Sequence, residues 1–368
     1  MNSKLSYDII GLGLFGAVIL FGVPAFFSYD GFELNTFARY LSLAIVSMAL
    51  ALSWGTAGLL NLGQAATFGM GSYAMAMHLK LKASGDNLPD FMGWNNVEAL
   101  PALWVPFNSL TFTLLAGLLI PAAVGGLIAT FMFRARIAGV FVAVITLAFL
   151  VAFQLLVIEQ QGFTGGQNGL TGLAQLELFG WTVDIYATSF YYLVGGCLMA
   201  ALIFGLYLTH SKFGLVLRAI REDAERTRYF GYNVANYQTL IFCISAGLAG
   251  LAGMLYALVL EFASPTYMSV SFSLAIVIWC AVGGRESVLA AAMGAILVNL
   301  AEGRLSDVFV EGWHMMLGVL FVAVVMFMPR GIYGVIVDAG RALRRRGGSE
   351  EFAETPSFDT PLNTKQES

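Results

Sequence analysis

The side chains of this sequence that could do chemistry gather in one charged segment, GLVLRAIREDAERTRYFG, at positions 214–231. At helical periodicity its charged side chains share one face: Arg218, Arg221, Glu222, Glu225 and Arg228. Its apolar side chains share the opposite face: Leu217, Ile220, Ala224 and Phe230. The pattern predicts one short amphipathic helix, too polar to cross a membrane, that ends at Gly231 in the left-handed conformation.

Two interpretations fit this helix. As a surface helix, its arginines would only hold one side of the chain in the cytoplasm, where basic residues of membrane proteins concentrate. As a docking helix, it would bind a cytosolic partner and pass that partner's movement to the membrane part. The remainder of the sequence is needed to choose between the two.

A second set of polar side chains lies within otherwise apolar stretches: Asn61, Gln64, Gln154 and Asn299. Such groups suit an uncharged solute that forms hydrogen bonds, and they equally suit hydrogen bonds between helices. Ionisable side chains are nearly absent from these stretches, whereas proton-driven carriers place Asp, Glu or His at membrane depth. A proton-driven carrier is therefore disfavoured.

Several other chemistries lack the residues that they need. No Walker A motif occurs, so we expect that any ATP is hydrolysed by another chain and that this chain is not an enzyme. The three histidines and three cysteines have no metal-ligand spacing, which predicts neither a metal site nor a disulfide. The net charge of −4 gives no reason to expect a nucleic-acid partner.

The elements that carry these residues are membrane helices. Hydrophobic residues make up 58% of the chain and charged residues 11%, and the mean hydropathy is +0.77. Apolar segments fall at about 8–28, 37–56, 60–79, 109–133, 138–158, 189–209, 238–262, 272–283, 287–301 and 313–333. We predict an all-α polytopic membrane protein with about eight to ten transmembrane helices. The short pair 272–283 and 287–301 is either two half-helices or two spans.

The distribution of basic residues predicts the topology. With the N-terminus in the cytoplasm, only four of the 19 basic residues face outward: Arg39, Lys80, Lys82 and Arg304. The positive-inside rule therefore places both termini in the cytoplasm. We divide the chain into a first helix and outer loop (1–36), a transmembrane domain (37–335) and a disordered cytoplasmic tail (336–368) with Arg344-Arg345-Arg346 near membrane lipid.

Glycine recurs in two clusters, at 55–71 and at 246–253. In the second cluster, Ala246/Gly250 and Ala249/Gly253 form small-xxx-small pairs, which predict close helix packing. The first cluster also holds Asn61 and Gln64, and its glycines could break a helix so that freed backbone groups face a pathway. Packing and a pathway both remain open for the first cluster.

Several stretches together resemble the permeases of ATP-binding-cassette importers, in the branched-chain amino acid and urea family. They are RAIREDAER (218–226), FGYN (230–233), SAGLAGLAGMLY (245–256), LLNLGQAATFGMGSY (59–73), NGLT (168–171), AVGGR (281–285) and MPRGIYG (328–334). Within the family, LPDFM (88–92) with Trp94, GGQNGLT (165–171) and IVIWCAVGGR (276–285) are more similar to the urea permease. Urea or a short amide is thus the expected substrate, and a branched-chain amino acid is the alternative.

The resemblance implies a multi-pass protein of the bacterial inner membrane that works with a second permease, two cytosolic ATPases and a periplasmic binding protein. ATP and Mg²⁺ would be held by the ATPases. The docking helix would be the coupling helix, and its contact residues would be Arg218, Ala219, Arg221, Glu222, Asp223, Ala224, Arg226 and Gly231. The pathway would involve Asn61, Gln64, Thr67, Phe68, Gln154, Trp279 and Asn299.

Two other classes of protein also fit parts of the pattern. A self-contained channel or facilitator for a neutral solute would tolerate the lack of buried charge, but it has no need for so charged a helix at 214–231. A membrane scaffold would fit if both glycine clusters served packing alone.

Overall fold

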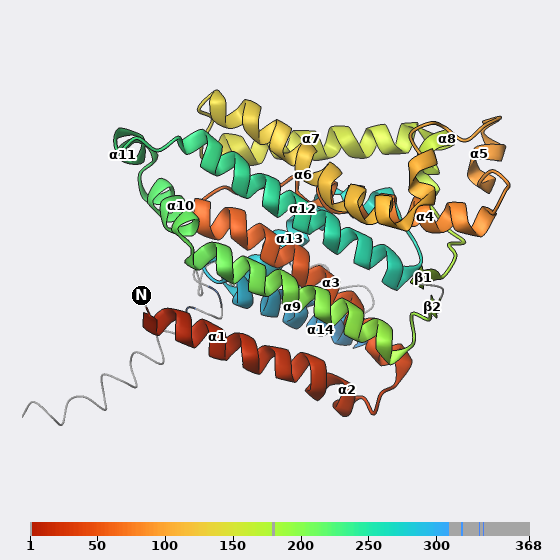
Figure 1. The fold of residues 1–368 in the computed structure, drawn as a ribbon, viewed down its shortest axis with the longest axis horizontal. Coiled ribbons are helices and arrows are strands. Elements are labelled where there is room, and N and C mark those ends of the chain that lie inside the picture. The colour runs from red at the N-terminus through yellow and green to blue at the C-terminus, as the bar shows by residue number, and fades with distance from the viewer. Residues whose placement is uncertain (1, 179–180, 309–317, 319–330, 332–333, 335–368) are drawn as a thin grey trace, which may run out of the picture.

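The structure is a computed structural model that describes residues 2–178, 181–308, 318, 331 and 334. Figure 1 shows long helices that run roughly alongside one another. Two short helices, α10 (Lys212–Glu222) and α11 (Ala224–Tyr229), form one end. The opposite end, here the loop end, holds the connections within 85–109 and 160–187.

The remaining helices are α1 (Asn2–Ala17), α2 (Val23–Phe26), α3 (Gly31–Ala51), α4 (Gln64–Ser84), α5 (Asp90–Trp94), α6 (Leu110–Arg134), α7 (Val140–Glu159), α8 (Gln161–Thr164), α9 (Thr188–His210), α12 (Val234–Leu260), α13 (Val270–Gly283) and α14 (Val288–Val308). A π-helical segment joins α1 to α2, and another, Leu52–Thr56, extends α3. The strands β1 (Leu176–Leu178) and β2 (Trp181–Val183) form an antiparallel pair at the loop end.

Each predicted apolar segment from 8–28 to 287–301 coincides with helix over most of its length, and the longest exception is the non-helical stretch 60–63 at the start of 60–79. Among the described residues, six helices are long and apolar enough to cross a membrane, or seven if the bent pair α13–α14 counts as one span. The expectation was about eight to ten. The difference arises because α4 carries polar residues and is not among the six, because the 14-residue α13 is short, and because segment 313–333 falls outside the described residues except for two positions.

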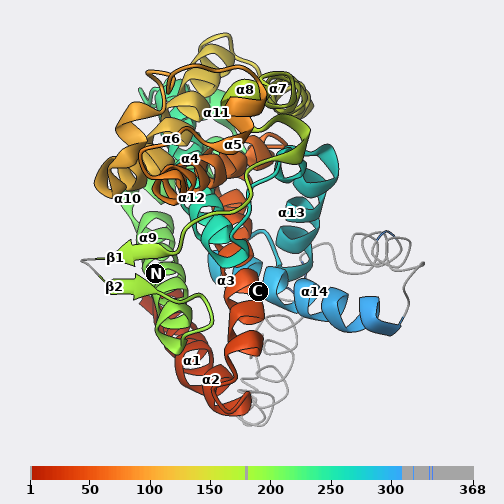
Figure 2. The ribbon, with the colours of Figure 1, turned by 90° about the vertical axis from the view of Figure 1, so that its right-hand side faces the viewer.

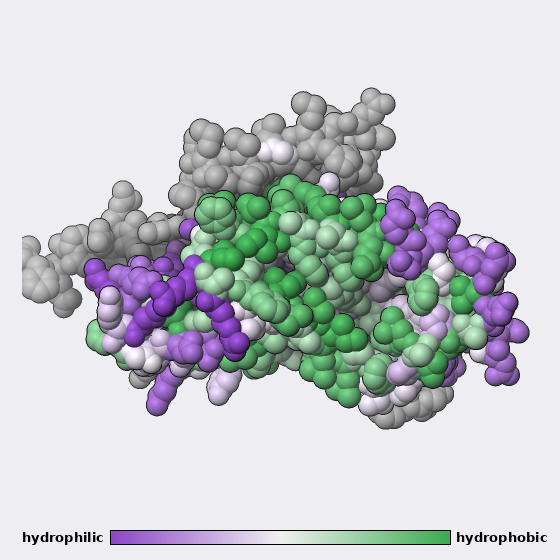
Figure 3. All heavy atoms as spheres, turned by 90° about the horizontal axis from the view of Figure 1, so that it is seen from above, coloured by the Kyte–Doolittle hydropathy of each residue, from purple (hydrophilic) through white to green (hydrophobic). Residues whose placement is uncertain are grey.

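The surface agrees with a membrane protein. Figure 3 shows a broad hydrophobic belt between hydrophilic caps, one over α10 and α11 and one at the loop end. Helices α6 and α7 expose large apolar side chains, among them Phe131 and Phe141. Apolar side chains that face lipid need no partner within the protein.

The core is built around α3 and α12. Their apolar windows are 89% and 72% buried, whereas those of the other four membrane-crossing helices are between 22% and 39% buried. Viewed from the loop end, α3 lies between α9 on one side and α14 on the other (Figure 2). The pair α3 and α12 is therefore the framework to which the outer helices attach.

The glycine cluster at 246–253 packs as predicted. A Cβ added at Gly253 would lie 1.8 Å from the Phe68 carbonyl oxygen, so α12 touches the backbone of α4 there. On another face, a Cβ added at Gly250 would lie 2.3 Å from the Gly117 carbonyl oxygen of α6. Small residues thus let α12 approach two helices closely.

The N-terminus lies at the same end as α10 and α11 (Figure 1). The side chain of Asp8 contacts His210, the last residue of α9, with 2.9 Å between Oδ2 and Nε2. This contact fixes which end of the bundle holds the N-terminus. The side of the membrane that this end faces stays a prediction, and the predicted tail 336–368 lies outside the described residues.

Candidate functional site

The charged segment 214–231 forms two helices, where the sequence pattern predicted one. Helix α10 ends at Glu222 and α11 begins at Ala224. Asp223 between them is extended, with φ −156° and ψ 101°, and its carboxylate accepts a hydrogen bond from the Arg226 amide at 3.0 Å. Aspartate caps helix N-termini in this way, so Asp223 starts a new helix where the charge pattern alone suggested continuity.

The break changes which side chains are buried. Leu217 and Ile220 of α10 are buried, as predicted. Phe230, predicted on the same apolar face, is 82% exposed, and its neighbour Tyr229 is 89% exposed. The prediction for Phe230 was wrong because the periodicity of α10 does not continue through Asp223. The exposed rings leave an aromatic surface at the end of α11.

Gly231 ends the charged segment as predicted. Its φ is +87°, a left-handed conformation that favours glycine, and its amide donates to the Arg228 carbonyl at 2.9 Å. The chain then turns back into α12, which begins at Val234. The charged segment is therefore tied closely to one of the two central helices.

Arg221 joins α10 to the other central helix. Its guanidinium donates a hydrogen bond to the carbonyl oxygen of Gly55, in the π-helical end of α3. Gly58 has φ +73°, and a Cβ added there would lie 2.9 Å from Cγ of Arg221. The side chain thus packs against the end of α3 and also bonds to it.

A second arginine reaches the same end of α3. The guanidinium of Arg285, in the turn between α13 and α14, lies over the Trp54 ring at 5.1 Å from its centroid. A Cβ added at Gly55 would lie 1.8 Å from the Arg285 carbonyl oxygen, so the two backbones touch. In the sequence, Arg285 stands out only as part of the AVGGR stretch, and no periodic signal links it to Trp54.

The other predicted coupling residues are spread over the surface of α10 and α11. Arg218 donates to the Thr209 carbonyl at 3.0 Å, and Arg226 pairs with Asp223 at 2.8 Å. Ala219 and Glu222 are exposed, and Ala224 is half-buried. These residues stay within one short stretch of surface at the α10–α11 end (Figure 1).

Asn61 and Gln64 lie in a buried hydrogen-bond network. Asn61 donates to Gln64 Oε1 at 2.7 Å, and Gln64 donates to the Ser245 carbonyl at 3.0 Å. The Ser245 hydroxyl in turn donates to the Ala49 carbonyl of α3 at 2.5 Å. The amides therefore join the start of α4 to α12 and α3, the interhelical role that was one of their two interpretations.

The backbone just before α4 is not helical. Residues 58–63 separate the π-helical end of α3 from α4. The Leu62 amide donates to the Thr146 hydroxyl of α7 at 3.1 Å, and the Leu62 carbonyl accepts from Ser273 of α13 at 2.5 Å. Irregular backbone inside a bundle is tolerated where protein groups satisfy it, and here two further helices do so.

Three further pathway candidates lie near this break. Thr67 bonds to the Gln64 carbonyl at 2.8 Å. Phe68 is fully buried, with its ring 5.1 Å from that of Phe272, which lies 5.9 Å from Trp279. The structure thus places Thr67 and Phe68 on the same helical turn as Gln64, whereas Trp279 is connected to Phe68 through the ring of Phe272.

The last two pathway candidates lie apart from that group. Gln154 of α7 donates to the Pro265 carbonyl at 3.3 Å, towards the loop end of the bundle. Asn299 donates to the Ala295 carbonyl of its own helix α14 at 2.8 Å. Hydrogen bonding therefore gives Asn299 a local role within α14.

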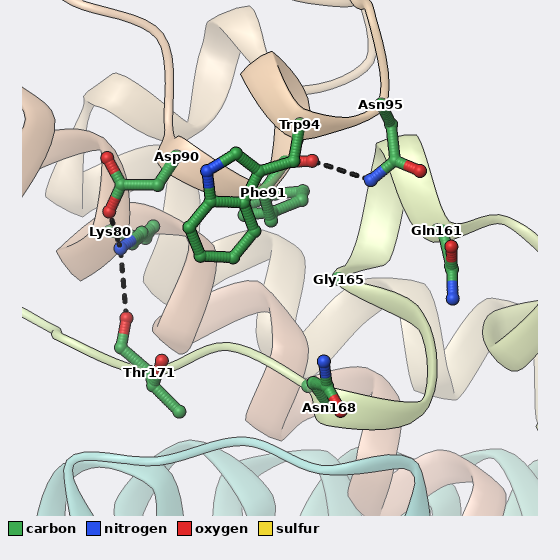
Figure 4. Close-up of a pocket in the computed structure, with 10 residues that line it drawn as sticks. Lys80, Asp90, Phe91, Trp94, Asn95, Gln161, Gly165, Asn168 and Thr171 are labelled. Atoms are coloured by element: carbon green, nitrogen blue, oxygen red, sulfur yellow. Dashed lines mark hydrogen bonds and ion pairs between the residues drawn. The ribbon is translucent and has the colours of Figure 1, made fainter.

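One cavity, which the sequence analysis missed, lies at the loop end. It has a volume of about 480 Å³, and Lys80, Asp90, Trp94, Gln161, Asn168 and Thr171 contribute to its lining. Figure 4 shows these side chains around an open space between α5 and the 165–171 segment. Lys80, near the end of the apolar segment 60–79, could have indicated this cavity, but it was counted only as an outward-facing basic residue.

Comparisons with known proteins identify the family. A family model described as "Branched-chain amino acid transport system / permease component" matches residues 33–325. The LivM permease of Salmonella typhimurium, from a high-affinity branched-chain amino acid transport system, is 29% identical over 315 residues, covering 78% of this chain and 67% of LivM. LivM of Escherichia coli is 28% identical over 313 residues with the same coverage, and BraD of Pseudomonas aeruginosa is 31% identical over 132 residues, covering 35% of this chain and 42% of BraD. No solved structure matches.

These relatives support the branched-chain amino acid alternative better than the urea expectation, which nothing in the comparisons supports. The family and the apolar helices also make the chain a multi-pass protein of the bacterial inner membrane. With most of its length matched by the family model, the chain belongs to the permease family of branched-chain amino acid transport systems.

Proposed function

We propose that this chain is the membrane-spanning permease subunit of an ATP-driven importer of branched-chain amino acids. The match of the family model over residues 33–325 carries this proposal. The named relatives, all permeases of branched-chain amino acid systems, favour these substrates over urea.

The proposed assembly contains further subunits. A second permease would complete the pathway, two cytosolic ATPases would hold ATP and Mg²⁺, and a periplasmic binding protein would deliver the solute. The relatives are named as components of transport systems, which supports partners in general terms. In this assembly the α10–α11 end faces the cytoplasm, in keeping with the positive-inside rule.

The ATPase would dock on α10 and α11. The residues that we assign to this contact are Arg218, Ala219, Arg221, Glu222, Asp223, Ala224, Arg226 and Gly231. Support comes from the bond between Arg221 and Gly55, because a docking element must be firmly joined to the helices that it moves. The exposed rings of Tyr229 and Phe230 add apolar area of the kind that interface centres use.

The pathway would open beside the break before α4. Irregular backbone at membrane depth occurs where transporters bind and pass their solutes, which favours residues 58–63 with Asn61, the adjoining Gln64, Thr67 and Phe68, and Trp279 beyond Phe272. In the present conformation their amides bond to other helices. Transport would therefore require these hydrogen bonds to break and be replaced by others as α3, α4 and α12 shift.

Uptake by cells tests the proposal. Cells that lack this chain but keep its partner genes should fail to take up labelled leucine at low concentration, and the chain should restore uptake. Excess isoleucine and valine should compete, and excess urea should not. Leucine uptake that excess urea blocks and excess isoleucine leaves unchanged would contradict the proposal and favour urea as the substrate.

A self-contained facilitator is the competing class. It would purify without ATPases and would equilibrate leucine across a membrane without ATP. The charged pair α10 and α11 argues against it, because a facilitator has no use for a docking surface. Co-purification in mild detergent separates the two, since an importer subunit should retain a second permease and ATPase chains.

A further inference from the structure

The cavity at the loop end combines both signs of charge with unused amide groups. Lys80 of α4 has a side chain only 9% exposed, and its ammonium donates to Asp90 at 3.3 Å and to the Thr171 carbonyl at 3.0 Å. An ammonium has three N–H donors, so one remains beyond these two contacts. Asp90 binds through Oδ2, and its side chain is 71% exposed, so its carboxylate can accept further hydrogen bonds.

The opposite wall is shaped by the glycine-rich segment 165–171. Gly165 and Gly169 have φ of +77° and +70°, and a Cβ added at Gly169 would lie 2.1 Å from the Ala263 carbonyl oxygen. The Leu170 amide donates to that same carbonyl at 2.8 Å. Close backbone contact therefore fixes this segment against the chain just beyond α12, and the wall is held in place.

The wall presents polar groups that have no partner. Within the described residues, the side-chain amides of Gln161 and Asn168 make no hydrogen bond, and neither does the Thr171 hydroxyl. By contrast, the Asn95 amide on the same rim donates to the Phe91 carbonyl at 2.7 Å. Figure 4 shows the Asn168 amide directed towards the open space, with Thr171 and Gln161 on either side of it.

An aromatic surface completes the cavity. The Trp94 residue is 79% exposed although it sits on a short helix whose neighbour Phe91 is buried. Figure 4 shows its ring lying between the Lys80–Asp90 pair and the 165–171 segment. A volume of about 480 Å³ falls in the range of small-molecule sites.

We propose that this cavity is a binding site for a free α-amino acid with an apolar side chain. The ligand carboxylate would accept from the free N–H of Lys80, the ligand ammonium would donate to Asp90 and to Asn168, and the side chain would lie against Trp94. A zwitterion fits because the cavity offers one cation and one anion next to each other. The choice of an amino acid rests on the proposed function, and in that function the site would receive substrate at the outer mouth before it enters the bundle.

Direct binding tests the site without transport. The chain and its partner permease, purified together into nanodiscs without binding protein or ATPase, are titrated with labelled leucine. Two probes each lack one charge: 4-methylpentanoate has no ammonium, and 3-methylbutylamine has no carboxylate. Leucine should bind, and both probes should bind at least about 10-fold more weakly, since each loses a charge-assisted hydrogen bond.

Variants locate the site. Lys80→Met should weaken leucine binding by about 10-fold or more. Trp94→Ala and Asn168→Ala should each weaken it by several-fold, and both residues are exposed, so their loss leaves the fold intact even if Lys80→Met does not fold. The matched control is Lys82→Met, which removes an exposed pair with Glu177 outside the cavity and should leave binding unchanged.

The outcomes separate this inference from the proposed function. Leucine uptake in cells together with no leucine binding to the nanodiscs up to about 10 mM would overturn the site and leave the function standing. Leucine binding that Trp94→Ala and Asn168→Ala both leave unchanged would also overturn the site. Failure of leucine uptake with intact, Lys80-dependent leucine binding would overturn the function and leave the site.

Discussion

Arg221 is the side chain that most directly connects the charged surface to the membrane bundle. The sequence pattern predicted it on the charged face of an amphipathic helix, which describes its position in α10. Its bond to Gly55 could not be predicted, because the two residues are far apart in the chain and the partner is a backbone carbonyl. Sequence periodicity predicts which face of a helix a residue occupies, but it does not predict which segment distant in sequence packs against that face.

We predict that Arg221→Glu uncouples transport. The change replaces a donor to the Gly55 carbonyl by an acceptor, so α10 loses its attachment to α3 while the outer surface of α10 keeps its shape. Leucine uptake should fall by about 10-fold or more while ATP hydrolysis by the complex continues. The measurement is uptake and ATPase rate on the same preparation, with Arg221→Lys expected to retain part of the uptake.

We also predict that Gln64→Leu destabilises the protein. Its amide joins Asn61 to Ser245, so its loss breaks the link between α4 and α12 and leaves the buried Asn61 NH2 group without its partner, at a cost of about 1–3 kcal/mol. Thermal unfolding in detergent should show the loss. Gln154→Leu is the comparison, since Gln154 is less buried and makes one bond, to Pro265. Equal stability of the Gln64 variant and the wild type would contradict the network.

At the scale of elements, hydrophobic segments located the helices well. Within the described residues every predicted apolar segment is mostly helical, although 60–79 begins with the non-helical residues 60–63, and the small-residue cluster 246–253 packs as expected. The division of 214–231 into α10 and α11 was missed, although Asp223 before Ala224-Glu225-Arg226 is a typical N-cap. The regular spacing of charged residues suggested one continuous helix, because in a periodicity pattern the Asp223 carboxylate looks like any other charged surface residue.

Close packing of α12 on α4 gives a further prediction. Gly253→Ala places a Cβ where the Phe68 carbonyl oxygen lies 1.8 Å away, so the two helices must separate and stability should fall by about 1–3 kcal/mol. Gly196→Ala in α9 is the matched control, because nothing lies within 4 Å of its added Cβ. That variant should equal or slightly exceed wild-type stability, given the better helix propensity of alanine. A Gly253 variant as stable as the Gly196 variant would show that the helices are not in contact.

At the scale of the whole molecule, the sequence could predict class and family more readily than substrate. The membrane class and the bias of basic residues depend on composition and hydropathy, which one sequence records fully. The substrate depends on a few side chains in a shared fold, and local similarity in segments such as 165–171 favoured urea while comparison along the whole chain favours branched-chain amino acids. The structure shows that this segment shapes a cavity wall by backbone geometry, which unrelated substrates could share.

Cysteine labelling can determine which end of the helix bundle faces the cytoplasm. In a background with Cys197, Cys243 and Cys280 replaced by alanine, a single cysteine at Arg226 should react with a membrane-impermeant maleimide only after the membrane is opened. A single cysteine at Lys82, at the loop end, should react in intact spheroplasts. Both residues are well exposed, with side chains 82% and 47% accessible. The reverse pattern would place α10 and α11 outside and remove them from any cytosolic ATPase.

In the proposed importer, this chain moves branched-chain amino acids only when ATPases act on it through α10 and α11. The most direct measurement is leucine accumulation in proteoliposomes that contain the chain, its partner permease and the ATPases, with binding protein and leucine on the outer side and ATP inside. We predict accumulation against a gradient with ATP and none without it, and none with the Arg221→Glu chain. Leucine flux of equal rate without ATP, or through the chain alone, would contradict the claim and identify a facilitator.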